Sequence, residues 1–223
     1  MTNQQFLQQF GHFIEAPNGI QKLRELILQL AVQGKLVAQD PNDEPASELL
    51  KRIQAEKEKL VSEGKFKMPK TLPSLSEDEF PFILPNGWNY ARLGDLVRII
   101  NGRAYKRHEM LESGTPLLRV GNLFTSNEWY YSDLELEDDK YCDEGDLIYA
   151  WSASFGPFIW NGPKVIYHYH IWKLSFYNDK FLYKNYLYTF LQEKTQEIKA
   201  SGHGISMAHM TKGNYSPPTQ CGE

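Results

Sequence analysis

The chain has 223 residues, and its hydrophobic fraction of 41% and aromatic fraction of 13% exclude wholesale disorder. A chain of this length can bury a core without metals or disulfides, so we expect one large domain or a domain with an appendage. The net charge of −4 excludes a uniformly basic surface, so composition alone does not indicate a nucleic-acid partner.

The negative charge is concentrated in one window of the sequence. Residues 126–146 hold nine acidic side chains and a single basic one, Lys140. Because this acidic window repels phosphate, we expect it to face away from an anionic partner or to contact another protein.

The sequence is typical of a cytoplasmic protein. Cys142 and Cys221 lie far apart, which favours two unpaired thiols over a disulfide. No apolar run approaches the roughly 18 residues of a membrane span, and the N-terminus lacks the basic start and apolar core of a signal peptide. We therefore expect no membrane partner.

An amphipathic helix is predicted over residues 20–32. Its apolar residues recur at helical spacing, Asn18 is the candidate N-cap and Gly34 is the candidate stop. After a polar turn, a second helix is predicted over residues 45–62, with Asp43 as its N-cap.

The second predicted helix ends at Gly64 and carries a Glu48–Arg52 pair on its solvent-facing side. Several prolines and a loss of periodicity then indicate a linker, and we place the domain boundary near Ser76. The expected organisation is an N-terminal helical region with linker at 1–75, a strand-rich domain at 76–218 and a tail at 219–223.

Strand patterns dominate after Trp88. Short apolar or alternating runs predict strands at residues 90–100, 115–123, 145–151 and 164–176. A further helix is predicted over residues 180–199, with Asp179 as its cap and Gly202 as its stop. The expected fold class is α+β: an N-terminal helical segment and one mixed α/β domain with a twisted, largely antiparallel sheet.

The sequence lacks the usual catalytic patterns. It has no phosphate-binding glycine loop, no G-x-S-x-G turn and no glycine pattern of a dinucleotide or S-adenosylmethionine pocket. His168 and His170 would share one strand face as two metal ligands do, but no third ligand is apparent nearby, so polar or packed histidines are favoured over a metal site. Asp43, Glu63 and Lys65 imitate a nuclease set, but a predicted helix holds its acids roughly 30 Å apart.

Four segments in chain order carry a family resemblance. They are LRELILQLAVQGKLVAQDPNDEPASELLKRIQAEKEKL, FPFILPNGWNYARLGDLVRIINGRAYKR, TPLLRVGNL, and EGDLIYAWSASFGPFIWNG followed by VIYHYHIWKLSF. Together they resemble the specificity subunit of type I restriction-modification systems, from about Leu23 to Pro218. The match in order is more specific than any one of the segments.

The resemblance implies a role in DNA recognition without catalysis. In this family, a complete subunit has two α/β recognition domains, separated by long antiparallel helices, and each domain reads one half of a split site on double-stranded DNA. The subunit docks the methyltransferase subunit and, through it, the restriction subunit. The resemblance therefore implies no cofactor for this chain, because S-adenosylmethionine would bind the methyltransferase.

The chain departs from the family pattern at its end. It has one recognition domain and stops at SPPTQCGE, where the family reads P-P-L-x-E-Q and enters a spacer helix. A half-length or truncated form is therefore expected, with a second half-subunit as a candidate partner. The alternative hypothesis is a protein-docking module, or a truncated remnant, without DNA binding of its own.

The candidate DNA contacts are centred on the loop at 101–107, where three cations, an amide and an aromatic ring fall within seven residues. Arginine forks onto guanine or phosphate, lysine suits phosphate and serine reads bases weakly. A solvated hairpin loop, and a salt bridge for Arg119, are the structural alternatives, and Trp151 is expected in the core. The predicted DNA-binding residues are Asn101, Arg103, Tyr105, Lys106, Arg107, Arg119, Asn122, Ser152, Ser154, His203, Ser206 and Lys212.

The apolar stripes of the two N-terminal helices need a partner to cover them. The resemblance suggests the spacer helices and the methyltransferase subunit, and a self-packed helical hairpin is the alternative. The predicted partner-docking residues are Leu23, Ile27, Leu30, Gln33, Lys35, Leu36, Leu49, Leu50 and Ile53.

Overall fold

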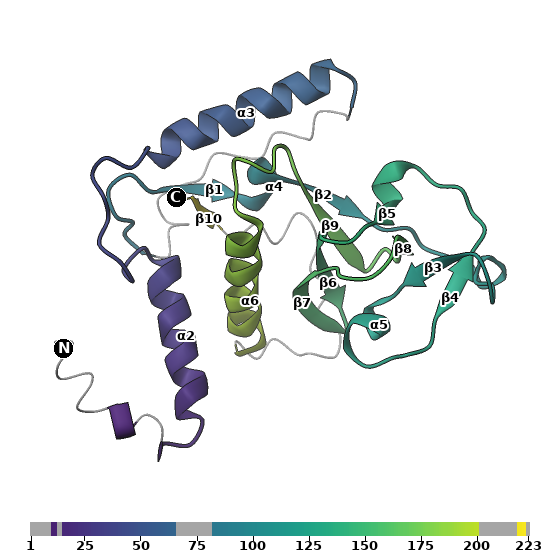
Figure 1. The fold of residues 1–223 in the computed structure, drawn as a ribbon, viewed down its shortest axis with the longest axis horizontal. Helices are drawn as coiled ribbons and strands as arrows, with labels where there is room; N and C mark the ends of the chain where they lie inside the picture. Colours follow the sequence, from purple (N-terminus) through teal and green to yellow (C-terminus); the bar gives the residue numbers. More distant parts are fainter. Residues whose placement is uncertain (1–9, 13–14, 66–81, 201–217, 222–223) are drawn as a thin grey trace.

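The computed structural model describes residues 10–12, 15–65, 82–200 and 218–221, with the backbone alone for 197–200 and 218–221 (Figure 1). The helices are α2 Gly19–Val32, α3 Ala46–Ser62, α4 Leu93–Leu96, α5 Val120–Phe124 and α6 Lys184–Ala200, with 3₁₀ turns η2 Arg107–Glu109 and η3 Asp138–Lys140. The strands are β1 Asn89–Arg92, β2 Val97–Asn101, β3 Thr115–Leu118, β4 Tyr130–Ser132, β5 Tyr141–Cys142, β6 Leu147–Ser152, β7 Ser154–Ile159, β8 Val165–Tyr167, β9 Ile171–Phe176 and β10 Pro218–Cys221.

The predicted α+β class is confirmed, but the strands form more than one sheet. A first four-stranded sheet has the order β2-β9-β6-β7, a second has the order β4-β3-β8-β5, and β1 pairs with β10. All pairings between these strands are antiparallel except that of β3 with β8, which is parallel. The second sheet lies at the end of the molecule opposite α2 (Figure 1).

Three of the predicted strands are interrupted. The helical turn α4 divides 90–100 into β1 and β2, and the predicted strand 115–123 becomes helix α5 after Leu118. The run 164–176 bends at residues 168–170, so that β8 joins the second sheet and β9 joins the first. This bend is the reason that one predicted sheet is observed as two.

The predicted N-cap is confirmed for α2 and wrong for α3. Asn18 is the N-cap of α2 but makes no side-chain capping hydrogen bond. The expected cap Asp43 is wrong, because Pro45 is the N-cap of α3 and the Ala46 N–H donates to the Gly87 carbonyl at 2.7 Å. Helix α6 begins at Lys184, four residues after the predicted start. A capping bond from elsewhere in the fold thus replaces the local side-chain cap of α3.

The predicted helix stops agree better with the structure. Gly34 and Gly64 have φ of 66° and 70°, the left-handed conformation in which helices commonly end. The predicted Glu48–Arg52 pair is wrong: Glu48 pairs with Lys51 at 2.7 Å, and Arg52 pairs with Glu44. The stop predicted at Gly202 lies outside the described residues.

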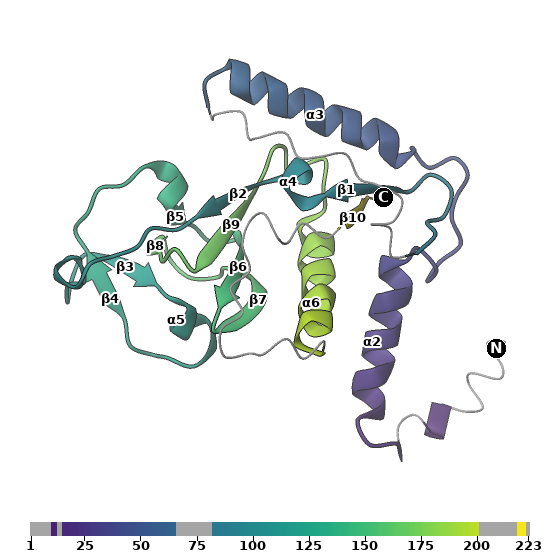
Figure 2. The ribbon, with the colours of Figure 1, turned by 180° about the vertical axis from the view of Figure 1, so that it is seen from behind.

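The N-terminal helices share a core with the first sheet and α6. Helix α2 packs alongside α6, and α3 lies across β1 and α4 (Figures 1 and 2). The core residues of α2 and α3 are Val32, Ala46, Leu49 and Ile53, and those of α6 include Leu187, Phe190 and Leu191. Helix α3 therefore buries its apolar face against the rest of the chain, whereas α2 contacts α6 but keeps Ile20, Leu26 and Ile27 at 40–43% exposure. The predicted boundary near Ser76 lies outside the described residues.

Candidate nucleic-acid interface

The parallel strands β3 and β8 end side by side, and the chain turns sharply just beyond β8. The turn is made by His168, Tyr169 and His170, between β8 of the second sheet and β9 of the first. The His168 N–H donates to the Leu118 carbonyl at 3.0 Å, and the Ile171 N–H donates to the His168 carbonyl at 2.9 Å. The turn is thereby fixed to the end of β3.

The loop that follows β2 lies directly on this turn. The Arg103 N–H donates to the Tyr167 carbonyl at 3.1 Å, and the Tyr169 N–H donates to the Arg103 carbonyl at 3.0 Å. A Cβ on Gly102 would lie 2.3 Å from the Tyr167 oxygen and 2.4 Å from the His168 oxygen. Only glycine allows this approach, so the cationic loop and the turn form one unit.

The hairpin of β6 and β7 completes the surface. The Trp151 N–H donates to the His170 carbonyl at 3.1 Å, and its indole Nε1–H donates to the Tyr169 carbonyl at 3.1 Å. The hairpin turns at Ala153, which has φ of 62°. We call the combined surface the strand-end edge, and it comprises Gly102–Glu109, Arg119, Trp151–Ser154 and His168–His170.

Arg103, the first predicted DNA contact in the loop, has a partner within it. Its guanidinium donates to both carboxylate oxygens of Glu109, at 2.6 and 3.0 Å, and lies 5.0 Å from the centre of the Tyr105 ring. The side-chain bond from Arg103 and the backbone N–H of Lys106 lower the pKa of Glu109 to about 2. Arg103 therefore holds the loop in one shape.

Tyr105 corrects an expectation. It is 8% exposed and packs with Leu117 and Ile166, so its ring lies in the core beneath Arg103 and is unavailable to DNA as the chain is folded. Burial raises the pKa of its hydroxyl to about 12. An aromatic residue between exposed cations gives no sequence signal that it points inward.

The other predicted residues of the loop remain open to solvent. Lys106, Arg107 and Asn101 are exposed. Among the described residues, neither Lys106 nor Arg107 has an ion-pair partner, whereas the Asn101 carbonyl accepts a hydrogen bond from Lys140 at 3.1 Å. Two cations are thus presented beside the strand-end edge.

Arg119 and Asn122 lie where β3 passes into α5. The Arg119 side chain stacks 5.0 Å from the centre of the Tyr130 ring. The Asn122 amide is used locally, since its Oδ1 accepts from the Arg119 N–H at 3.0 Å and its Nδ2 donates to the Glu128 carbonyl at 2.7 Å. Asn122 therefore caps and braces α5, which does not favour its expected contact with a base.

The tryptophan and the serines of the β6–β7 hairpin differ in exposure. Ser152 is buried at 8% exposure, whereas Ser154 is half-buried. Trp151 is also half-buried and stacks on Trp172 with ring centres 5.7 Å apart, in partial agreement with its expected place in the core. The predicted contacts His203, Ser206 and Lys212 lie outside the described residues.

The sequence pattern does not indicate that His168, Tyr169 and His170 form a turn beside the cationic loop. Their rings form a tight group, with centres 4.5 Å apart for His168 and Tyr169 and 4.9 Å for the two histidines. Burial, and to a smaller extent His170 and Arg119, lower the pKa of His168 to about 4.

The described residues contain no cluster of three or more potential metal ligands and no helix long and apolar enough to span a membrane.

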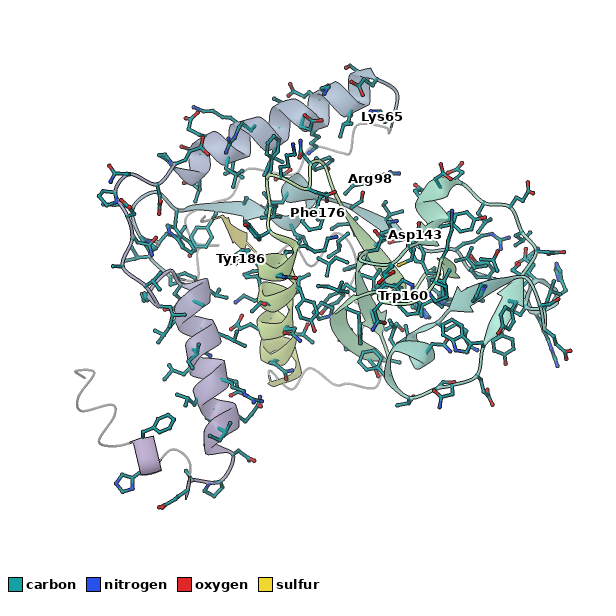
Figure 3. All side chains as sticks on the ribbon, in the orientation of Figure 1. Lys65, Arg98, Asp143, Trp160, Phe176 and Tyr186 are labelled. Atoms are coloured by element: carbon teal, nitrogen blue, oxygen red, sulfur yellow. The ribbon has the colours of Figure 1, made fainter. Side chains whose placement is uncertain are left out.

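The acidic window is partly neutralised by the sheets. Asp139 pairs with Arg98 of β2, and Asp146 pairs with Lys173 of β9, each at 2.6 Å. Figure 3 shows Arg98 on β2 and places Asp143 and Trp160 in the half of the molecule that holds the second sheet. Cys142, at the same window, is fully buried, and burial raises the pKa of its thiol.

The predicted docking residues fall into two groups. Leu49 and Ile53 are buried in the chain's own core with Leu50 packed against them, so these residues are not free for a partner. On α2, Leu23 and Leu30 are half-buried and Ile27 is 42% exposed.

The corner after α2 contacts the segment that leads into β1. Gly34 lies against Pro85 and Trp88, and the Trp88 indole donates to Gln39 at 2.7 Å. Near it, Lys35 donates to Gln33 at 2.9 Å, and Leu36 is 49% exposed. The corner thus joins α2 to the chain that precedes β1.

These features define an α+β domain with an edge of cations, histidines and aromatic rings. The family model described as type I restriction modification DNA specificity domain matches residues 85–215, which contain the whole of this edge. The match covers more than half of the chain, and the chain belongs to this family.

Two curated relatives come from Escherichia coli. The chain is 50% identical to the type I restriction enzyme EcoAI specificity subunit over 116 residues, 52% of this chain and 20% of that protein. It is 65% identical to the EcoEI specificity subunit over 81 residues, 36% of this chain and 14% of that protein. The chain therefore spans a fifth or less of the length of these relatives.

Among solved structures, the chain is similar to the HsdS subunit from Thermoanaerobacter tengcongensis. The similarity has a TM-score of 0.43 at 17% identity, and it covers 78% of this chain and 41% of that chain.

Proposed function

We propose that this chain is a non-catalytic DNA-recognition module of a type I restriction-modification complex and that it reads one half of a split site. The family match over residues 85–215 carries the proposal, because the matched range holds every residue of the strand-end edge. The edge offers the two kinds of group that such a module needs, cations for phosphates and polar side chains for bases.

The cations are suited to positioning DNA. Lys106 and Arg107 are exposed at one end of the edge, where phosphate oxygens can approach without breaking an ion pair within the described chain. Phosphate contacts of this kind set orientation and register but carry no sequence information. They also make binding dependent on salt.

We assign methylation and cleavage to partner subunits, and S-adenosylmethionine to the methyltransferase subunit. Helix α2 is a candidate docking surface because Ile20, Leu26 and Ile27 are 40–43% exposed on it. A second half-subunit is a further candidate partner. The proposal also includes a cytoplasmic location, where such a complex meets DNA.

The net charge of −4 suggests a division of labour within the complex. If the methyltransferase clamps the DNA, this chain contributes specificity more than affinity. We expect a band-shift titration to show weak, salt-sensitive binding by the chain alone and tight binding with a type I methyltransferase subunit present. Tight sequence-specific binding by the isolated chain would contradict this division.

The experiment that tests the function is selection from a random DNA duplex library by the chain assembled with the methyltransferase subunit. One short enriched half-site is expected. The double variant Lys106→Ala/Arg107→Ala should bind roughly tenfold more weakly, with a salt slope smaller by about 2, whereas Lys180→Ala, an exposed cation outside the edge, should bind normally. Enrichment of no sequence would instead support a docking module without DNA binding.

A further inference from the structure

Polar side chains in the strand-end edge and beside it are already hydrogen-bonded within the chain. The Arg103 guanidinium is held by Glu109 through two hydrogen bonds, and the Asn122 amide is bonded at both of its ends. A group that reads a base must present its donors and acceptors outward. Arg103 and Asn122, which the sequence predicts as DNA contacts, are therefore poorly placed to read bases.

The backbone of the turn at residues 168–170 is hydrogen-bonded to several neighbouring segments. Its backbone bonds to three other segments: to β3 at Leu118, to the cationic loop at Arg103 and to the hairpin at Trp151. A reading element needs such support, because a misplacement of even 1 Å weakens the discrimination between bases. The turn thus presents its side chains from a fixed backbone.

The side chains of the turn have the chemistry of base readers. The His168 ring is half-buried against the Tyr169 ring, with centres 4.5 Å apart. Burial lowers its pKa to about 4, so the imidazole is neutral near pH 7, with one ring nitrogen as a donor and the other as an acceptor. A neutral ring gains little from phosphate charge but can pair with a base edge. Tyr169 is 37% exposed beside it and adds a hydroxyl and an aromatic face.

From this placement we infer that His168 and Tyr169 are specificity-determining residues and that Arg103 is a positioning residue for the loop beside them. The inference rests on the proposed function, since it says which residues of the edge read the bases. It reverses the order that the sequence suggests, in which the arginines read and the histidines pack.

The first test compares base preference with salt dependence. In the assembly with the methyltransferase subunit, His168→Asn and Tyr169→Ala should each reduce discrimination at one or more base pairs by roughly tenfold in library selection. The salt slope of binding should stay unchanged, because neither substitution removes a phosphate contact. The double variant Lys106→Ala/Arg107→Ala should behave in the opposite way: the salt slope of its binding should be smaller, and its preferred sequence should be unchanged.

The second test separates positioning from reading at Arg103. Arg103→Glu should weaken binding to the preferred sequence, and the reversed pair Arg103→Glu/Glu109→Arg should restore part of it, because the cross-loop ion pair is rebuilt although the Lys106 N–H loses its carboxylate acceptor. An arginine that contacts guanine directly would not be rescued by an arginine at position 109. Thermal unfolding of each variant checks that the fold is kept, and His168→Gln and Tyr169→Phe replace any variant that unfolds.

The outcomes distinguish the inference from the function on which it rests. If His168 and Tyr169 variants keep the full base preference while Arg103 variants relax it without rescue, the inference is overturned and the DNA-reading function stands. If the unaltered assembly shows no base preference, the proposed function itself fails.

Discussion

Two charged segments of this domain, the loop after β2 and the acidic window at residues 126–146, use their charges in opposite ways. In the acidic window, Asp139 and Asp146 pair with cations that project from β2 and β9. In the loop, the Arg103–Glu109 pair is formed within the loop, while Lys106 and Arg107 stay exposed.

The difference shows that a run of like charges does not by itself tell which side chains stay exposed, because Asp139 and Asp146 find cations on the first sheet. The acids of the window are drawn to cations fixed on the first sheet, and the Lys140 amine of the same window bonds to the Asn101 carbonyl at the end of β2. The acidic window is therefore partly neutralised within the chain, whereas Lys106 and Arg107 of the loop stay exposed.

Breaking the contact between the loop and the turn at 168–170 should cause the largest loss in the free energy of unfolding. In Gly102→Ala, the new Cβ would lie 2.3 Å from the Tyr167 oxygen, so the loop or the turn must shift, at a cost of about 3 kcal/mol in the free energy of unfolding. Urea titration measures this loss. Gly145→Ala is the control for backbone strain alone, because Gly145 has φ of 87° with open space around it, and about 1 kcal/mol is expected there. Equal losses in the two variants would contradict the close contact.

Removing a paired acid from the acidic window should have a smaller effect. Asp139→Asn breaks the 2.6 Å pair with Arg98, whose side chain is only 35% exposed, and should lower the unfolding free energy by about 1 kcal/mol. Asp138→Asn, at the exposed neighbour, should change it by less than about 0.5 kcal/mol. Urea titrations of the two variants side by side make the comparison, and a larger loss for Asp138→Asn would reverse the assignment of paired and unpaired acids.

The fold class and the main helices could be predicted because each depends on a local pattern. The apolar spacing in 20–32 and 45–62 predicts helices that the structure contains, and Gly34 and Gly64 end them as expected. The bend at 168–170 could not be predicted, since apolar and polar-tipped residues alternate without a break and the bend exists only because β8 and β9 pair with different sheets.

The sequence indicates the cations of the loop at 101–107 but not how the loop is held. The inward direction of Tyr105 and the pairing of Arg103 with Glu109 depend on the core and the turn that the loop packs against. Asn122 is different, because an asparagine three residues after Arg119 fits a helix-capping pattern that could have been recognised. Whether the predicted residues contact DNA stays a prediction.

Acid should lower the free energy of unfolding in two successive pH ranges, first through His168 and then through Glu109. The His168 pKa is about 4 in the fold against 6.5 for a free histidine, so the unfolded chain binds more protons between these values and stability falls as the pH drops through that range. The Glu109 pKa is about 2 against 4.5, so its contribution is present above pH 4.5 and is lost at lower pH.

Unfolding free energies measured by urea from pH 7 to pH 3 test these windows. His168→Asn should flatten the curve between pH 6.5 and 4, and Glu109→Gln should flatten it only below about pH 4.5. A curve for His168→Asn that stays parallel to that of the unaltered chain would mean that another group titrates in this range.

The smallest effect on stability should come from the cations that matter most for the proposed function. Lys106→Ala and Arg107→Ala remove exposed side chains that have no ion-pair partner among the described residues, so each should change the unfolding free energy by less than about 0.5 kcal/mol. Arg103→Ala should lower the melting temperature measurably, because it leaves Glu109 without its guanidinium partner and uncovers the Tyr105 ring. Melting curves of the three variants make the comparison. If Lys106→Ala or Arg107→Ala lowered the melting temperature as much as Arg103→Ala, these side chains would stabilise the loop itself. The contrast between exposed cations in the loop and paired acids in the acidic window would then not hold.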